Sequence, residues 1–128
     1  MSYSSDWNSS GEAVVSIDPD EFAAAESEAE SAADKYTHKF RKPFPYMGKE
    51  YVEMNFDWGS LTGADGLNIE AEMQALGNAV VVPALSGGYL IRMAARACAE
   101  GVGYDAFELM PLGDSNRIRS EARSFLWA

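Results

Sequence analysis

Hydrophobic and polar residues alternate along residues 36–56, and this period of two predicts a β-hairpin. One face of the first strand is predicted to carry Tyr36, His38 and Phe40, and one face of the second to carry Val52, Met54 and Phe56. Gly48 stands between the strands, where a tight turn needs a positive φ. Pro43 and Pro45 place the end of the first strand at an edge or a bend.

Beyond residue 58 the apolar spacing changes to that of helices. Thr62 and Asp65 resemble a capping box and predict a helix start, although Gly66 disfavours an uninterrupted helix there. Residues 79–85 are apolar, but Pro83 excludes a central strand, so we expect a buried linker.

Two amphipathic helices are predicted in the second half of the chain, over residues 86–100 and 114–127. Ser86 is the expected N-cap of the first, and Asp114 or Ser115 opens the second. Between them, Asp105 and Glu108 frame a second capping box for a short turn. The predicted core consists of Phe56, Leu90, Ile91, Ala94, Cys98, Phe107, Leu109, Ile118, Phe125 and Leu126.

The charge of the chain is concentrated at its beginning. Residues 1–34 hold nine of the 20 acidic residues and no Lys or Arg, so the remainder carries 11 acidic and ten basic residues. With few large apolar side chains, this segment is predicted to be a largely disordered acidic arm with a marginal helix at 19–34. The predicted fold is therefore α+β: this arm, then a domain at 35–128 with an N-terminal β-hairpin and three to four α-helices.

Residues that could carry chemistry are few and isolated. His38 is the only histidine and Cys98 the only cysteine, so a zinc site with three or four such ligands cannot be assembled, and a Cys98 nucleophile would have His38 as its only histidine base. We interpret His38 as a strand surface residue and Cys98 as a small core residue. Asp57, Asp65, Glu70 and Glu72 are interpreted as a solvated face. The sequence thus predicts no enzyme, no metal and no cofactor.

Nucleic acid and membrane are also unlikely partners by composition. Basic residues at 35–49 are interleaved with aromatic ones, as in a single-strand binding platform, but the acidic arm lies immediately upstream. No stretch of 18 apolar residues and no signal peptide is present, and one cysteine fits a reducing compartment. We expect a cytoplasmic protein without nucleic-acid partners, and leave self-association open.

The order of motifs resembles the phage tail assembly chaperone families. A hairpin with a glycine turn is followed by LTGAD at 61–65, YLIRMAAR at 89–96, DAFEL at 105–109 and SFL at 124–126. The resemblance covers roughly residues 36–127 and leaves the acidic arm unmatched. The insertion of Gly66-Leu67-Asn68 departs from the family pattern.

This resemblance implies a protein that binds and solubilises the tape measure protein during tail morphogenesis, with the tail tube protein as a second candidate partner. It implies action in the host cytoplasm and absence from the mature virion. The alternative is a minor tail or head-tail component that stays in the virion. The residues expected to contact the partner are Tyr89, Leu90, Met93, Arg96, Arg119, Arg123, Phe125 and Trp127.

Overall fold

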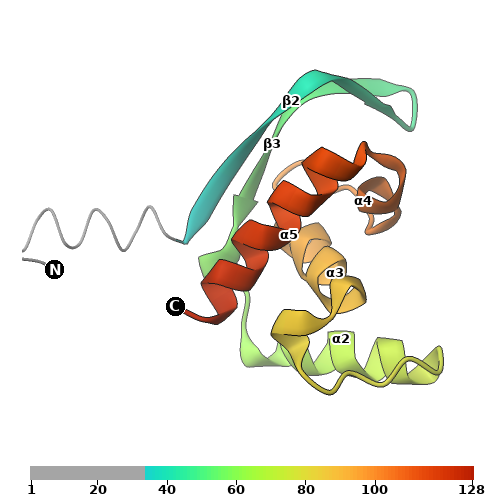
Figure 1. Ribbon diagram of the computed structural model, residues 1–128, viewed down its shortest axis with the longest axis vertical. Helices are drawn as coiled ribbons and strands as arrows, with labels where there is room; N and C mark the ends of the chain where they lie inside the picture. The colour runs from blue at the N-terminus through green and yellow to red at the C-terminus, as the bar shows by residue number, and fades with distance from the viewer. Residues whose placement is uncertain (1–33) are drawn as a thin grey trace, which may run out of the picture. The chain divides into compact units, whose positions relative to one another are not determined.

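The computed structural model describes residues 34–128, so the predictions for residues 1–33 lie outside the described part. The fold is α+β, as predicted: an antiparallel hairpin of β2 (Lys35–Tyr46) and β3 (Lys49–Asp57) precedes four α-helices (Figure 1). These are α2 (Gly63–Ala75), α3 (Gly87–Ala97), α4 (Asp105–Leu109) and α5 (Leu112–Leu126), with 3-10 turns η1 (Trp58–Ser60) and η2 (Pro83–Leu85).

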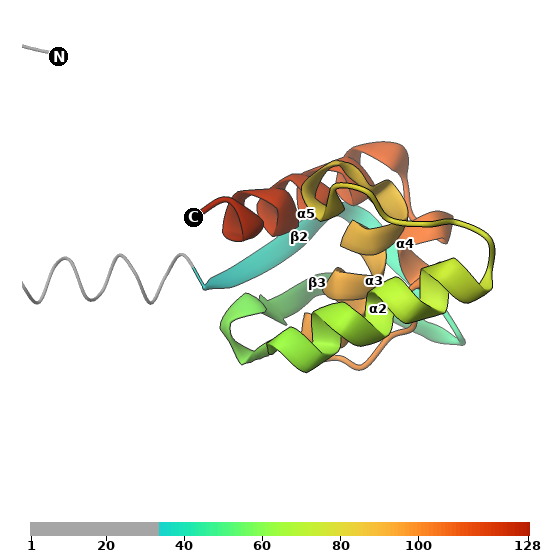
Figure 2. The same ribbon diagram turned by 90° about the horizontal axis from the view of Figure 1, so that it is seen from below.

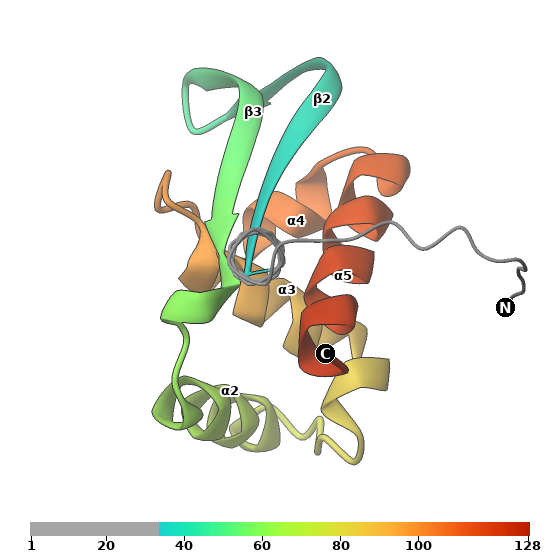
Figure 3. The same cartoon turned by 90° about the vertical axis from the view of Figure 1, so that its left-hand side faces the viewer.

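The elements of this domain lie in a simple order. Helix α5 runs beside β2, and α3 lies between α5 and α2 (Figures 1 and 2). In Figure 3 the hairpin of β2 and β3 lies at one end of the domain and helix α2 at the other, with α3 between them. Asp34, the last residue of the predicted arm, joins this domain, since its carbonyl accepts the N–H of Trp58 at 2.7 Å.

The hairpin turn is a two-residue loop in which both residues have positive φ. Met47 has φ 51° and Gly48 has φ 78°. Such turns match the twist of the flanking strands, and glycine adopts this conformation without a steric cost. The prediction for Gly48 is confirmed, whereas Met47 occupies a backbone conformation that favours asparagine or glycine.

An irregularity in the strand pairing changes which side chains face the helices. Lys39 pairs with Glu53, but the next pair is Phe44 with Tyr51, so residues 40–43 lie opposite the single residue Val52. Cross-strand partners share a face of the sheet. Along β3 the inward-facing residues therefore change from the odd-numbered Tyr51 to the even-numbered Met54 and Phe56. Val52, expected on the same face as Phe56, is 65% exposed.

The core lies between the hairpin and the helices. Its largest fully buried side chains are Trp58, Met54, Ile69, Leu90 and Ile118. The ring of Phe56 stacks on Trp58 with centroids 5.2 Å apart, and it also contacts Phe107 at 5.9 Å. Most of the predicted core is confirmed, with Phe125 and Leu126 only partly buried. The prediction was wrong for Leu109, which is 68% exposed because Ala106, Phe107 and Met110 fill the inner side of the short α4.

The helix starts agree in part with the predictions. The capping box of α2 is present, with the N–H of Thr62 bonded to Asp65 Oδ2 at 2.8 Å. Helix α2 continues through Gly66, where the absence of a side chain leaves room for the Tyr89 hydroxyl; a Cβ would lie 3.0 Å from that oxygen. Ser86 caps α3 as predicted, accepting the N–H of Tyr89.

Two other predicted starts were wrong. Asp105 does not cap α4, because its carboxylate accepts the Tyr46 hydroxyl at 2.7 Å and Tyr104 is the N-cap. Helix α5 begins at Leu112 after Pro111, so Asp114 lies within its first turn and does not open it.

Helix α3 ends at Ala97, earlier than predicted, because the next residues pair with β3. Cys98 forms a bridge with Phe56, and the N–H of Ala99 bonds to the Asn55 carbonyl at 2.8 Å. The Glu100 carboxylate accepts both the backbone N–H and the side-chain amide of Asn55, each at 2.9 Å. This carboxylate supplies acceptors at the edge of β3 where a further strand would supply carbonyls.

Candidate partner-binding surface

Exposed large apolar side chains gather in the segment between α2 and α3. In residues 76–85 these side chains are Leu76, Val81, Val82 and Leu85. Val81 is 89% exposed, Val82 is 45% exposed and Leu85 is 67% exposed. Three exposed valine and leucine side chains within five residues are unusual. Grouped exposed apolar side chains of this kind mark surfaces for protein contact. We name residues 76–85 the apolar segment.

The apolar segment is held firmly at its second half. Ala84 is buried, and η2 contacts both α3 and α5. Arg123 of α5 donates from Nε to the carbonyl of Ala84 at 2.8 Å, and Pro83 fixes its own φ. Buried backbone and small side chains thus anchor the segment while Val81 and Leu85 project into solvent.

Its first half is fixed by the end of α2. The N–H of Gly77 bonds to the Gln74 carbonyl at 2.9 Å, and the N–H of Asn78 bonds to the Met73 carbonyl at 2.8 Å. Gly77 has a positive φ of 82°, as is common just after a helix. A surface that is ordered before binding loses less entropy when a partner docks. The prediction of a buried linker at 79–85 was wrong, since the connection between α2 and α3 runs over the outside.

Charged residues near α2 and α3 are engaged within the domain. Arg96 pairs with Asp65 at 2.9 Å, and Arg92 lies 3.5 Å from a Glu72 carboxylate oxygen. The backbone N–H of Thr62, and after it the Arg96 guanidinium, hold the pKa of Asp65 below its ordinary value. Arg92 also covers the ring of Tyr104, 4.1 Å from its centroid. Asp65 and Glu72 therefore link α2 to α3 while they remain accessible to solvent, in agreement with their interpretation as a solvated face.

Three residues expected to contact a partner belong to the core. Tyr89, Leu90 and Met93 are buried, and Leu90 has no exposed surface. The reason is that α3 lies in the middle of the domain and contacts α2, α5 and β3. A single amphipathic stripe predicted one buried face, but neighbouring elements cover more of this helix than that stripe. These residues cannot form a contact surface in this conformation.

The other expected contact residues lie nearer the surface. Arg96 pairs with Asp65, and Arg119 bonds to Asn116 within α5. Arg123 holds the apolar segment, and Phe125 is partly buried. Only Trp127 is a large apolar side chain with most of its surface exposed, at the end of α5. The structure thus brings Arg123 to the apolar segment, whereas it does not gather the eight residues into one face.

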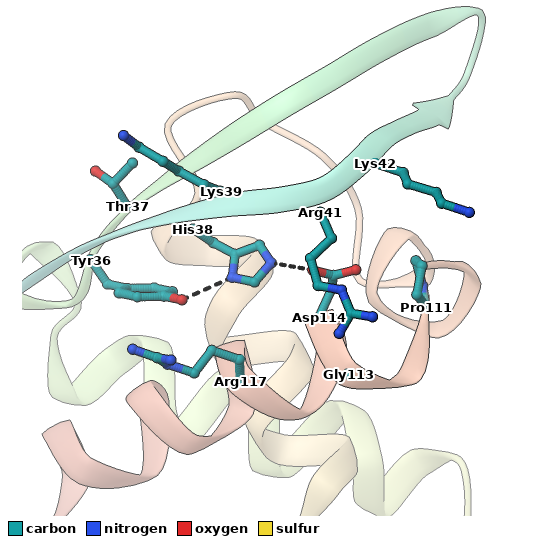
Figure 4. A pocket seen from close by; sticks show the side chains of 10 residues that line it. All are labelled: Tyr36, Thr37, His38, Lys39, Arg41, Lys42, Pro111, Gly113, Asp114 and Arg117. Atoms are coloured by element: carbon teal, nitrogen blue, oxygen red, sulfur yellow. Dashed lines mark hydrogen bonds and ion pairs between the residues drawn. The ribbon is translucent and has the colours of Figure 1, made fainter.

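A second feature is a pocket of about 660 Å³ between β2 and the start of α5 (Figure 4). The pocket is lined by Tyr36, Thr37, His38, Lys39, Arg41, Lys42, Pro111, Gly113, Asp114 and Arg117. At its base, His38 Nε2 lies 2.7 Å from Asp114 Oδ1. Four of the chain's ten Lys and Arg residues thus line a single pocket that contains one carboxylate.

His38 is buried and bonded on both ring nitrogens, so its interpretation as a strand surface residue was wrong. A carboxylate can only accept, so Nε2–H donates to Asp114, and the Tyr36 hydroxyl lies 2.8 Å from Nδ1. These bonds satisfy polar groups that would be costly to bury alone. They join β2 to α5 across 76 positions of sequence.

Other candidates for chemistry within residues 34–128 are limited. Burial raises the pKa of the Cys98 thiol to about 11, which disfavours the reactive thiolate. No group of three or more His, Cys, Asp or Glu side chains that could hold a metal ion occurs in this described part. None of its helices is long and apolar enough to cross a membrane.

The sequence did not reveal the apolar segment as exposed or the His38–Asp114 pair. The signal for the first was present, since a proline within a short valine run at the end of a helix is poorly suited to a core strand. The pair joins residues far apart in the chain and has no local signal. In comparisons with known proteins, no family model matches the chain, and neither a curated protein nor a solved structure matches it.

Proposed function

We propose that this chain is a phage tail assembly chaperone that binds the tape measure protein and keeps it soluble while the tail is built. It acts in the host cytoplasm and does not remain in the finished particle. The observation that carries the proposal is the apolar segment, an ordered apolar surface on an acidic protein. The tail tube protein is a second candidate partner.

The resemblance to tail assembly chaperones supports this proposal through the order of its motifs. The LTGAD motif at 61–65 leads into α2, and residues 89–96 lie in α3. DAFEL at 105–109 is α4, and SFL at 124–126 ends α5. Each motif therefore occupies a separate helix or helix start.

Physical arguments support a holdase role in particular. A long helical partner exposes apolar surface before a tube encloses it, and a shielding protein needs apolar contacts of its own. Val81, Val82 and Leu85 supply them on a chain whose net charge is −10. Charge of one sign keeps complexes apart and soluble. An amphipathic helix of the partner is the expected ligand, because helices commonly dock through apolar stripes.

Co-expression with the cognate tape measure protein tests the proposal. The account predicts that the tape measure protein moves from the insoluble to the soluble fraction and that the two proteins are recovered together in a pull-down. A matched control is the tape measure protein expressed with an unrelated acidic protein of similar size, which removes a general effect of charge. An equally insoluble tape measure protein in both cultures would reject the chaperone function.

The alternative is a minor tail or head-tail component. It shares the expectation of a protein contact but differs in the fate of the chain. Mass spectrometry of purified virions separates the two, because a chaperone should be lost from the particle. Detection of the chain in virions at a fixed ratio to a tail protein would favour the structural component.

A further inference from the structure

We infer that the pocket between β2 and the start of α5 binds a carboxylate-bearing segment of a protein partner. This inference is independent of the chaperone function, since it rests on the charges of another face of the domain. The pocket's cationic side chains are Lys39, Arg41, Lys42 and Arg117. Its single carboxylate, Asp114, is already bonded to His38.

The cations that line the pocket come from two elements. Figure 4 shows Arg41 reaching from β2 toward the start of α5, in front of Asp114, whereas Lys42 and Lys39 extend outward from the strand. Arg117 comes from α5, and its guanidinium lies 5.7 Å from the centre of the Tyr36 ring. A ligand between the two elements would therefore meet guanidinium groups from both.

These cations are poorly neutralised by the domain itself. Within residues 34–128, Arg41, Lys42 and Lys39 form no ion pair, and Arg117 pairs only with the exposed Glu121 at 3.4 Å. Like charges that line one pocket repel one another, and a bound anion relieves this repulsion. The domain carries this concentration of positive charge although residues 35–128 have a net charge of only −1.

The chemistry of the pocket suits a carboxylate. The planar guanidinium groups of Arg41 and Arg117 match the two oxygens of a carboxylate. An acidic peptide also fits an open pocket whose lining includes the apolar surface of Tyr36 and Pro111.

Nucleic acid is disfavoured for a separate reason. Single-strand binding uses exposed aromatic rings on which bases stack. Phe44 is buried, and the Phe40 ring packs against it with centroids 5.5 Å apart, while Tyr36 stacks on Phe56 at 6.1 Å. The aromatic residues interleaved with the lysines thus pack inward, away from a strand that approached the cations.

The test measures binding of a fluorescein-labelled oligoglutamate peptide to the full chain by fluorescence anisotropy at low ionic strength. The double variant Arg41→Gln/Lys42→Gln removes two pocket cations. Lys35→Gln/Lys49→Gln is the matched control, since it removes the same charge from exposed positions of the hairpin outside the pocket. Thermal midpoints of all three proteins verify that they are folded.

The expected result is saturable binding that weakens at least about fivefold in the pocket variant, from the loss of two partly exposed charge contacts, and less than about twofold in the control. Oligoglutamine of the same length should not bind. Absence of oligoglutamate binding, or equal weakening in both variants, overturns the inference. Single-stranded oligothymidylate of equal charge that binds as tightly as the peptide also overturns it and makes nucleic acid the ligand.

Discussion

The buried pair of His38 and Asp114 offers the sharpest test of how the hairpin is held to the helices. The two side chains are 6% and 8% exposed, and the bond between them is 2.7 Å long. In His38→Leu the Asp114 carboxylate keeps its place in the first turn of α5 but loses the donor that satisfies it. A buried carboxylate that loses its hydrogen-bond donor destabilises the fold by about 3–5 kcal/mol. We expect a loss of unfolding free energy in this range.

Replacing both residues separates the cost of an unpaired buried carboxylate from the cost of the other contacts that His38 and Asp114 make. In His38→Leu/Asp114→Leu no carboxylate is left unsatisfied, so most of the loss should be recovered. The lost partner of the Tyr36 hydroxyl and the lost acidic residue in the first turn of α5 should still cost about 1–2 kcal/mol together. The double variant is therefore expected to be more stable than His38→Leu alone.

Urea unfolding followed by far-UV circular dichroism gives these free energies, with the slope of each transition as the check for two-state behaviour. The exposed Arg117–Glu121 pair is the control, because Glu121→Gln should cost less than about 0.5 kcal/mol. If His38→Leu costs less than about 1 kcal/mol, or the double variant is no more stable than the single one, the argument from burial is refuted.

Three further predictions concern the turn, the thiol and the edge of β3. Met47→Asn should raise stability by about 0.5–1 kcal/mol, because asparagine accepts the positive φ found there; an unchanged or lower thermal midpoint would count against this turn geometry. Cys98, with its pKa raised to about 11 by burial, should react with a disulfide reagent at pH 8 at least about 100-fold more slowly in the native protein than in urea; comparable rates would mean an exposed thiol. Burial opposes the ionisation of Glu100, but hydrogen bonds from Asn55 and Cys98 outweigh it and hold the pKa of Glu100 below its ordinary value. The ionised Glu100 side chain therefore stabilises the fold above the ordinary carboxyl pKa of about 4.3, and this stabilisation is lost as the pH falls through the lower pKa of the folded state. Glu100→Gln should flatten the acid side of a plot of unfolding free energy against pH. An identical slope in the variant would exclude this role.

The parts of this fold that the sequence predicts are those set by neighbouring residues. The Gly48 turn, the capping box of Thr62 and Asp65 and the Ser86 cap all depend on contacts within four positions. Alternation in β3 and the apolar stripe of α3 placed Phe56, Leu90 and their neighbours in the core correctly. The conformation of a turn or a helix cap depends on residues that are close together in the chain, so it can be predicted from a single sequence.

The parts that it does not predict depend on distant segments. Alternation placed Val52 on the same face as Phe56, but the four residues of β2 opposite Val52 change the facing at that point. Leu109 and Val81 are apolar without being buried, because hydrophobicity does not show which positions a neighbour will cover. The bond of His38 to Asp114 and that of Asn55 to Glu100 require the tertiary fold, and no local pattern announces either one.

For the same reason, the candidate contact surface in the structure differs from the one expected from the sequence. An amphipathic helix has one apolar stripe, and the sequence cannot say whether that stripe meets the core or a partner. In α3 it meets the core, which removes Leu90 and Met93 from any contact surface. The exposed apolar side chains lie in the connection before this helix, where Arg123 of α5 holds the backbone.

The affinity of the tape measure protein for two matched double variants tests the central claim most directly. Val81→Ser/Leu85→Ser removes apolar contacts from the apolar segment, and Val52→Ser/Leu112→Ser makes the same exchanges at exposed positions elsewhere. Burial of a valine or leucine side chain contributes about 1.5–3 kcal/mol, so the first variant should bind the tape measure protein at least about tenfold more weakly. The second variant should bind as the unchanged chain does. Equal affinities for the two variants would contradict the assignment of the apolar segment as the surface that holds the tape measure protein.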